Sequence, residues 1–288
     1  MNTLSEIEKW LKEHAINNYL ISEDFYITVQ GNVNLNKKLS VKKLPVKFKT
    51  VDGFFDISNN GLTSLDGCPK TVTGDFNCSR NSLISLFEGP TEVNDFDCSY
   101  NQLKNLSYAP KEVKGNFDCS NNLIDSVKGM PRTVKGYFNC SINKIATLKG
   151  GPKYVDATFD CSQNLIDRLT GGPVSVGQDY LCFKNNLTDL DGVADEIGFD
   201  LVSDIRLNHL SSTFNEEEKT WRYKGSEVIS HIYKPIVALT NVDDISRWLR
   251  KHEIKNFTIL KDNSVNVHGD VKLADKLANL LKLPLNFN

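Results

Sequence analysis

The sequence lacks the features of a membrane or secreted protein. Its 288 residues contain no apolar run of 18, and the first residues are polar and amphipathic rather than a charged segment followed by an apolar one. We therefore expect no membrane-spanning helix and no secretory leader. An intracellular, reducing location is then the default, and disulfides are uncommon there.

The sequence also lacks an excess of charge of either sign. Its 34 lysine and arginine residues oppose 36 aspartate and glutamate residues, which leaves a net charge of -2 when histidine is neutral. A chain without a strong overall field is not attracted as a whole to nucleic acid or to a membrane surface. Electrostatic recognition must therefore come from local groups of charges.

Motifs of catalysis and metal binding are missing as well. The chain contains no G-x-S-x-G, no Walker loop, no H-E-x-x-H and no C-x-x-C pair. No histidine is paired with a nucleophile at a telling spacing; the five are His14, His209, His231, His252 and His268. We predict that the protein is not an enzyme and has no cofactor or metal site. His14 and His252 precede an isoleucine at matching helix ends, which favours a packing role.

What the sequence contains in abundance is internal repetition. The hexapeptide FDCSYN at 96–101 recurs with small changes at 76–81, 117–122, 138–143 and 159–164. Seven copies follow one another in steps of 20 or 21 residues, aligned on Ile57, Cys78, Cys98, Cys119, Cys140, Cys161 and Cys182. Each copy reads V-x(2–3)-F-x-C-S-x-N-x-L-x-x-L-x-x-x-P, with the last copy ending on alanine instead of proline. A fixed period of this length indicates a solenoid with one coil per repeat.

This pattern resembles the short leucine-rich repeat of bacterial proteins, over residues 53–198. The resemblance implies that F-x-C is a short parallel strand with alternate side chains inward, and that the asparagine turns inward to bond the backbone as a ladder. Cysteine then occupies a tight core position, as a small hydrophobe. Neighbouring cysteines lie within disulfide reach, but their Cβ vectors point in parallel. Cys68 lies off this ladder and is expected to be the exposed thiol.

The two ends of the chain are copies of each other. Residues 7–39 align with 245–277 at an offset of 238, and KLPVKF at 43–48 meets KLPLNF at 282–287. Both copies read as a short amphipathic helix followed by strands, which suits the caps that a solenoid needs. The second copy either folds back as a C-terminal cap or presents an edge strand to another protein.

The expected organisation has four parts. We assign them to residues 1–52 (capping module), 53–198 (solenoid), 199–240 (flank and linker) and 241–288 (second capping module). Within the flank, EEEKTWRYKG reads as an exposed loop or hairpin, and SEVISHIYKPIVAL as a short helix broken near Pro235. The sequence thus predicts an α+β fold: a leucine-rich-repeat β-solenoid of about seven coils with small helix and strand capping modules at both ends.

The outward, concave side of the strands is where recognition is expected. Asp or Asn stands one residue before the cysteine and Ser one after it, with further aspartates three before. These residues either solvate the strands, form an acidic cradle for a basic partner segment with tyrosine anchors, or hold a divalent cation. The candidate partner-binding residues are Asp75, Asp95, Asp97, Tyr100, Asp118, Tyr137 and Asp160.

The proline side of each coil has the opposite sign. A basic residue follows the proline in four coils, at Lys70, Lys111, Arg132 and Lys153. A basic stripe at regular pitch can meet phosphates. No aromatic platform is interleaved with it, so nucleic acid is an unlikely partner.

The F-x-C-S-x-N repeat with the I-x-x-W-L-x-x-H-x-I-x-N cap is similar to leucine-rich-repeat-like proteins of tailed bacteriophages. That resemblance implies a cytoplasmic protein of an infected host cell or a minor virion component, and no reaction. The primary hypothesis is a protein-binding scaffold that engages a host or phage protein through its acidic concave face. One form of this hypothesis is that the scaffold inhibits the protein that it binds. The alternative is a structural or assembly protein that self-associates through its duplicated end modules, with 241–288 as the contact of a homo-oligomer.

Overall fold

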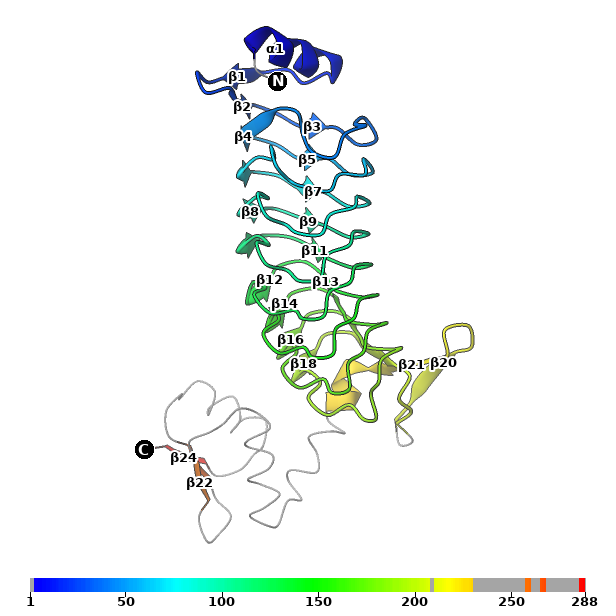
Figure 1. Cartoon of the computed structure of the whole chain (residues 1–288). Coiled ribbons are helices and arrows are strands. Elements are labelled where there is room, and N and C mark those ends of the chain that lie inside the picture. The colour runs from blue at the N-terminus through cyan, green and yellow to red at the C-terminus, as the bar shows by residue number, and fades with distance from the viewer. Residues whose placement is uncertain (1–2, 208–209, 230–256, 260–264, 268–284, 288) are drawn as a thin grey trace.

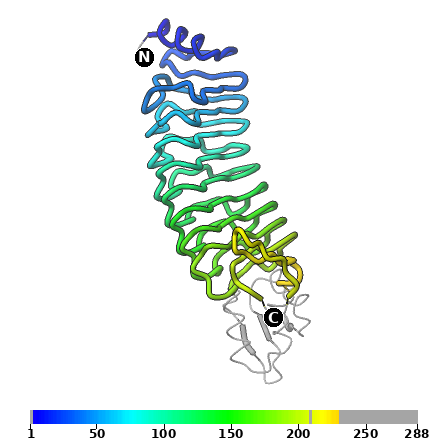
Figure 2. Tube along the Cα trace, turned by 90° about the vertical axis from the view of Figure 1, so that its right-hand side faces the viewer, coloured from blue at the N-terminus to red at the C-terminus, as the bar shows by residue number. Residues whose placement is uncertain are grey.

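The computed structural model describes residues 3–207, 210–229, 257–259, 265–267 and 285–287. The described chain forms a β-solenoid of about eight turns, with helix α1 (Leu4–Glu13) at its N-terminal end. Figures 1 and 2 show the coils stacked one on the next along the solenoid axis. In these ranges, no helix is long and apolar enough to cross a membrane.

Each coil contributes one strand to a sheet of eleven strands, called here the first sheet. Its parallel strands are β3 (Val33–Asn34), β5 (Phe55–Asp56), β7 (Phe76–Asn77), β9 (Phe96–Asp97), β11 (Phe117–Asp118), β13 (Phe138–Asn139), β15 (Phe159–Asp160), β17 (Tyr180–Leu181) and β19 (Asp200–Ser203). The hairpin β20 (Ser212–Asn215) and β21 (Thr220–Lys224) continues it, with β21 antiparallel to β19. The expected hairpin after the last coil is therefore confirmed.

A second strand in each coil builds the opposite side. One sheet consists of β1 (Tyr19–Ile21), β2 (Tyr26–Val29), β4 (Lys47–Val51), β6 (Thr71–Val72), β8 (Glu92–Val93) and β10 (Glu112–Val113). The next consists of β12 (Thr133–Val134), β14 (Tyr154–Val155), β16 (Ser175–Val176) and β18 (Glu196–Ile197). The core lies between these sheets and the first sheet.

The F-x-C alternation builds this core as expected. On each strand of the repeat the Phe or Tyr and the following Cys or Ile are buried, and the residue between them is half-buried. The rings stack from Phe48 to Tyr180 with centroids 5.0 to 5.8 Å apart. All seven cysteines are unpaired. The thiols Cys119 and Cys161 donate to carbonyl oxygens of the next coil at 3.4 Å.

The expectation that Cys68 is exposed is wrong, because its side chain is 5 % exposed. Gly67 turns the chain inward at a φ of 93°, so the following residue enters the core. Other coils bury a residue at the same place; these are Gly89, Ala109, Met130, Gly151, Gly172 and Val193. Because the residue type varies there, the repeat pattern did not reveal this core position.

The asparagine ladder is present in the form expected. The buried Asn122 donates from Nδ2 to the carbonyl oxygens of Cys98, Cys119 and Ser120, and its Oδ1 accepts from the Leu103 backbone N–H at 3.0 Å. One side chain thus joins two successive coils. The same bonds recur at Asn60, Asn81, Asn101, Asn143, Asn164 and Asn185.

The solenoid begins earlier in the chain than the repeat pattern. Helix α1 starts with a capping box between Thr3 and Glu6, and it buries Ile7, Trp10 and Leu11 in the core cluster that the coils share, with the Trp10 ring centroid 6.4 Å from that of Phe48. His14 stacks on Trp10 with centroids 4.1 Å apart and donates from Nδ1 to the Trp10 carbonyl at 2.8 Å, which is a packing role. Strands β3 and β4 already pair with β5 and β6. The structure therefore has about eight turns where about seven were expected.

The described strands near the C-terminus repeat the topology of the N-terminal module. β22 (Phe257–Ile259) pairs antiparallel with β23 (Val265–Val267), which pairs in parallel with β24 (Leu285–Phe287). β1, β2 and β4 are arranged in the same order and directions. Residues 225–229 are helical. Pro235, His252 and the other C-terminal histidines lie outside the described residues.

Candidate functional site

The candidate site is the outer surface of the first sheet, called here the sheet face. The residue between the buried Phe and Cys points outward on every strand from β5 to β15, in register with its neighbours in adjacent coils. These residues form one row up the sheet: Asp56, Asn77, Asp97, Asp118, Asn139 and Asp160.

Each member of this row holds the turn that follows its strand. Asp97 Oδ1 accepts from the Ser99 backbone N–H at 2.9 Å and from its hydroxyl at 2.6 Å. Asn77 makes the equivalent bonds to Ser79 at 2.9 and 2.7 Å. Asp and Asn therefore do the same local work here, and the carboxylate adds a negative charge that the turn does not require.

The expectation that the serines face outward is wrong. All six are buried: Ser58, Ser79, Ser99, Ser120, Ser141 and Ser162. The Asx turn rotates each of them away from solvent, and those after Asp56, Asn77, Asp97 and Asn139 donate their hydroxyls to that side chain. The sheet face thus presents carboxylates and amides to solvent, while the serine hydroxyls lie buried behind them.

A second row of side chains, three residues before the cysteine, links successive coils. Asp75 Oδ1 accepts from the Asp95 backbone N–H at 3.2 Å. Asp95 in turn accepts from the Asn116 backbone N–H at 2.8 Å and its amide at 2.9 Å, and Asn116 accepts from the Tyr137 N–H. The partner-binding candidates Asp75 and Asp95 therefore also support the stack.

The two rows converge on Tyr137. Burial raises the pKa of this phenol to about 12, and the charges of Asp118, Asp97 and Asp95 add to the effect. Burial is also the main cause of the raised pKa of Asp118, which hydrogen bonds from Ser120 and Asn139 partly offset and Asp97 reinforces. Four of the seven candidates, Asp95, Asp97, Asp118 and Tyr137, therefore form one cluster on β9, β11 and the segment before β13.

The other three candidates lie around this cluster. Asp160 is two strands further along its row, and burial raises its pKa. Asp75 is one coil before Asp95. Tyr100 is 45 % exposed at the turn after β9, where the Arg80 guanidinium lies 4.1 Å from the centre of its ring. This cation therefore stacks on an aromatic ring and is not ion-paired to the cluster.

Few cations neutralise the sheet face. In the described part of the chain, its ion pairs lie at the C-terminal end, where Arg222 reaches Asp179 at 3.6 Å and Asp200 at 3.1 Å. Within the described ranges, no ion pair includes the sheet-face carboxylates from β5 to β15, which are Asp56, Asp75, Asp95, Asp97, Asp118 and Asp160. Sequence reasoning missed the Arg222 contact because the hairpin that carries it lies outside the repeat.

The described carboxylates are not arranged as the ligands of a metal ion. Over the residues that the structure describes, no group of three His, Cys, Asp or Glu side chains is placed to hold a metal ion. The arrangement instead forms a linear array of negative charges at the pitch of the coils, with Tyr137 beside its centre. Such an array suits an elongated ligand with several positive charges.

Comparison of the chain with protein-family models, with curated proteins and with solved structures found no match. The fold by itself defines the class, a β-solenoid repeat protein.

Proposed function

We propose that the protein is a non-enzymatic binding scaffold that engages a basic segment of a protein partner on its sheet face. The observation that supports this best is the cluster of Asp95, Asp97 and Asp118 around Tyr137, in which burial raises the pKa of Asp118. Asn77 and Asn139 make the turn bonds without charge. Carboxylates at the other places of the row are therefore not required for folding.

The physical basis is preorganisation. Backbone N–H groups hold the carboxylates in place before a partner arrives, so little side-chain entropy is lost on binding. A lysine or arginine placed between neighbouring coils would face two carboxylates and would offset the cost of their partial burial. Tyr137, which is 38 % exposed, offers an aromatic surface at the centre of the array.

The repeat type and the biological setting belong to the same proposal. The strand, inward asparagine and buried leucine positions of each coil support a leucine-rich-repeat solenoid. With the resemblance to bacteriophage proteins, this favours a host or phage protein as the partner and the cytoplasm of the host cell or the virion as the location. The protein would inhibit this partner if the basic segment that it binds is also the functional site of the partner.

The test removes charge and keeps the fold. The triple variant Asp97→Asn/Asp118→Asn/Asp160→Asn retains the side-chain oxygen that accepts from the following serine, as Asn77 and Asn139 do. Its matched control, Glu92→Gln/Glu112→Gln/Asp125→Asn, removes three exposed carboxylates away from the sheet face. Both are compared with wild type in affinity capture from infected and uninfected lysate, followed by titration of the captured protein at several salt concentrations.

We expect the sheet-face variant to bind the captured protein about tenfold to hundredfold more weakly, at about 1 kcal/mol or less for each exposed charge pair. The control should bind as wild type does. Equal capture by all three proteins would refute the sheet face as the binding site.

A second candidate function is assembly through the end modules. It is favoured by the strand arrangement of β22, β23 and β24, which copies that of β1, β2 and β4. In the N-terminal module β4 also pairs with β6 of the solenoid, so this module type is built to join a stack. Deletion of 241–288 should abolish self-association if this is the function, and leave it unchanged otherwise.

A further inference from the structure

Two neighbouring coils depart from a backbone rule that the other five follow. Ten residues after the alignment position, the chain turns with a left-handed φ of 86° to 93° and carries glycine; these residues are Gly67, Gly129, Gly150, Gly171 and Gly192. The coils of Cys78 and Cys98 carry Glu88 and Tyr108 at this place, both at a φ of 68°. A bulky side chain rarely adopts this conformation.

The departure has no internal compensation. Tyr108 is 60 % exposed, so its ring adds little to the core. Glu88 makes one ion pair, with Lys70 at 2.6 Å, in which the Lys70 side chain is 53 % and the Glu88 side chain 39 % exposed. A solvent-accessible pair of this kind contributes little to stability. Glycine would make the same turn, as it does in five coils. Strained residues that the fold does not need are a signal of function.

The strained turns carry an exposed apolar surface. The ring of Phe87 is 55 % exposed and meets Tyr108 edge to face, with centroids 5.2 Å apart. Ile84, on the same connecting segment as Phe87, is 66 % exposed. We call Ile84, Phe87 and Tyr108 the Phe87 surface. Adjacent exposed aromatic side chains of this kind mark protein contacts.

Three lysines flank the Phe87 surface, and of the neighbouring carboxylates Glu88 is already paired with Lys70 and Glu112 is exposed. Lys104 and Lys111 lie on either side of Tyr108 in the chain, and Lys128 lies on the connecting segment of the next coil. All three are exposed, and none enters an ion pair within the described ranges. The segment that fits here therefore presents an apolar group beside carboxylates.

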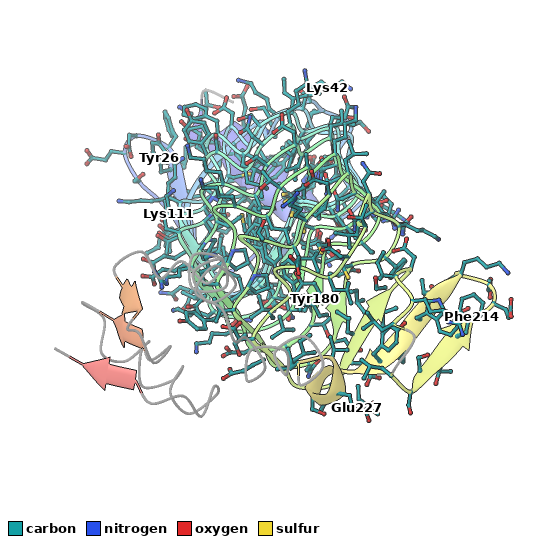
Figure 3. All side chains as sticks on the ribbon, turned by 90° about the horizontal axis from the view of Figure 1, so that it is seen from below. Tyr26, Lys42, Lys111, Tyr180, Phe214 and Glu227 are labelled. Carbon is teal, nitrogen blue, oxygen red and sulfur yellow. The ribbon has the colours of Figure 1, made fainter. Side chains whose placement is uncertain are left out.

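The hairpin of β20 and β21 has this chemistry. Its turn exposes Glu216, Glu217 and Glu218, which stand between Phe214 and Trp221 in the chain, and the ring centroids of this aromatic pair are 4.5 Å apart. Lys219 of the same turn pairs with Glu216 at 3.1 Å, so the tip keeps a net negative charge through Glu217 and Glu218. The hairpin projects from the side of the stack (Figures 1 and 3), and no strand of the described chain pairs with the outer edge of β20. An open edge and an acidic tip are both available to a partner.

The hairpin cannot reach the Phe87 surface of its own chain. It follows β19, and four strands of the first sheet, β17, β15, β13 and β11, lie between β19 and β9, which makes five inter-strand spacings. At about 4.8 Å per strand, the two lie roughly 24 Å apart along a rigid stack. The contact must therefore join two molecules.

We propose that the Phe87 surface binds the acidic hairpin of a second copy of this chain. Lys104, Lys111 and Lys128 face Glu216, Glu217 and Glu218, while Phe214 covers Phe87 and Tyr108. Trp221 supports Phe214 from behind, because it packs against the core of its own chain. The two surfaces differ, so the contact is head-to-tail and builds a ring or a filament. This self-association is independent of the sheet face and of residues 241–288.

The test uses full-length variants in sedimentation velocity over a range of protein concentrations. Phe87→Ser/Tyr108→Gly removes both aromatic rings of the Phe87 surface, and its second substitution restores the glycine that five coils carry, so the fold is retained. Glu216→Lys/Glu217→Lys/Glu218→Lys inverts the hairpin, and Lys104→Glu/Lys111→Glu/Lys128→Glu inverts the flanking charge. The control is Asp97→Asn/Asp118→Asn/Asp160→Asn on the sheet face.

We expect wild type and the control to associate, and each of the other three variants to associate at least tenfold more weakly. A mixture of the two charge-inverted proteins should associate again, because each then offers the complement of the other. A monomeric wild type at the highest concentration would overturn the proposal and leave the surface to a different protein. Association that survives all three variants, or a mixture that stays monomeric, would overturn it as well.

Discussion

The substitution Tyr180→Phe should stabilise the protein, although it removes a polar group. Tyr180 is the last ring of the buried stack and is 0 % exposed, and its ring centroid lies 5.0 Å from that of Phe159. Its hydroxyl is the one buried side-chain polar atom in the described residues that has no hydrogen-bond partner. Six preceding coils carry Phe at this place without an oxygen to satisfy; these are Phe55, Phe76, Phe96, Phe117, Phe138 and Phe159.

The magnitude follows from two opposing effects. Leaving a hydroxyl buried without a partner costs about 1–3 kcal/mol. The small void left by one oxygen atom costs a few tenths of a kcal/mol at about 24 cal/mol per Å³. The net gain is about 1–2.5 kcal/mol, which corresponds to a rise in Tm of about 2–8 °C for a chain of this size.

The assay is urea unfolding monitored by circular dichroism. Amide hydrogen exchange is measured as well in the coils of Cys161 and Cys182, because a solenoid can unfold in segments. The matched control is Phe159→Tyr, which places a hydroxyl near a space lined by Phe138, Gly172 and Pro173 that is too small for water. It should destabilise by a similar amount. If Tyr180→Phe lowers the midpoint, the hydroxyl has a partner and the reasoning is refuted.

Three further predictions concern the ladder, the turns and the sheet face. Asn122→Ala should cost about 2–4 kcal/mol in urea unfolding, because the buried Leu103 N–H loses its acceptor; a loss below 1 kcal/mol would contradict the ladder. Ile142 has a φ of 53°, so Ile142→Asn should raise the free energy of unfolding by about 1 kcal/mol, and a lower free energy of unfolding would show that the isoleucine side chain packs. Burial raises the pKa of Asp118 and Asp160 in the folded state, so acidification from pH 7 towards their folded pKa values should stabilise wild type relative to the variant Asp118→Asn/Asp160→Asn. A difference in unfolding free energy that stays constant with pH would argue against this effect.

The sequence predicted which residues of the candidate site face outward, but it did not predict the contacts that these residues make. The periodic Asp and Asn before each cysteine marked Asp97 and Asp118 as outward residues, and the structure places both on the sheet face. Their turn bonds to serine, and the convergence with Asp95 on Tyr137, were not foreseen. Strand alternation predicts which side a residue takes, whereas a hydrogen bond depends on the path of the turn that follows.

The Phe87 surface is marked in the sequence by the loss of the turn glycine in two coils, a position that the apolar repeat pattern does not include. The repeat was aligned on its apolar residues, while the turn glycines lay between them. Glu88 and Tyr108 are recognised as exceptions only when the turn position is compared across all seven coils and its left-handed φ is known. Exposure of Phe87 then depends on the rotation of the connecting segment, which the sequence period does not specify.

The repeat pattern was sufficient to predict the solenoid, its pitch and most of its core. Phenylalanine, cysteine, leucine and asparagine at constant spacing can be buried together only if every coil repeats the same path. The tertiary structure decided the start of the stack at β3, the burial of Cys68 and of the serines, and the isolation of the Tyr180 hydroxyl. These features arise where one coil meets the next or meets a cap. Such contacts depend on backbone direction between coils, and a pattern within one coil does not encode that direction.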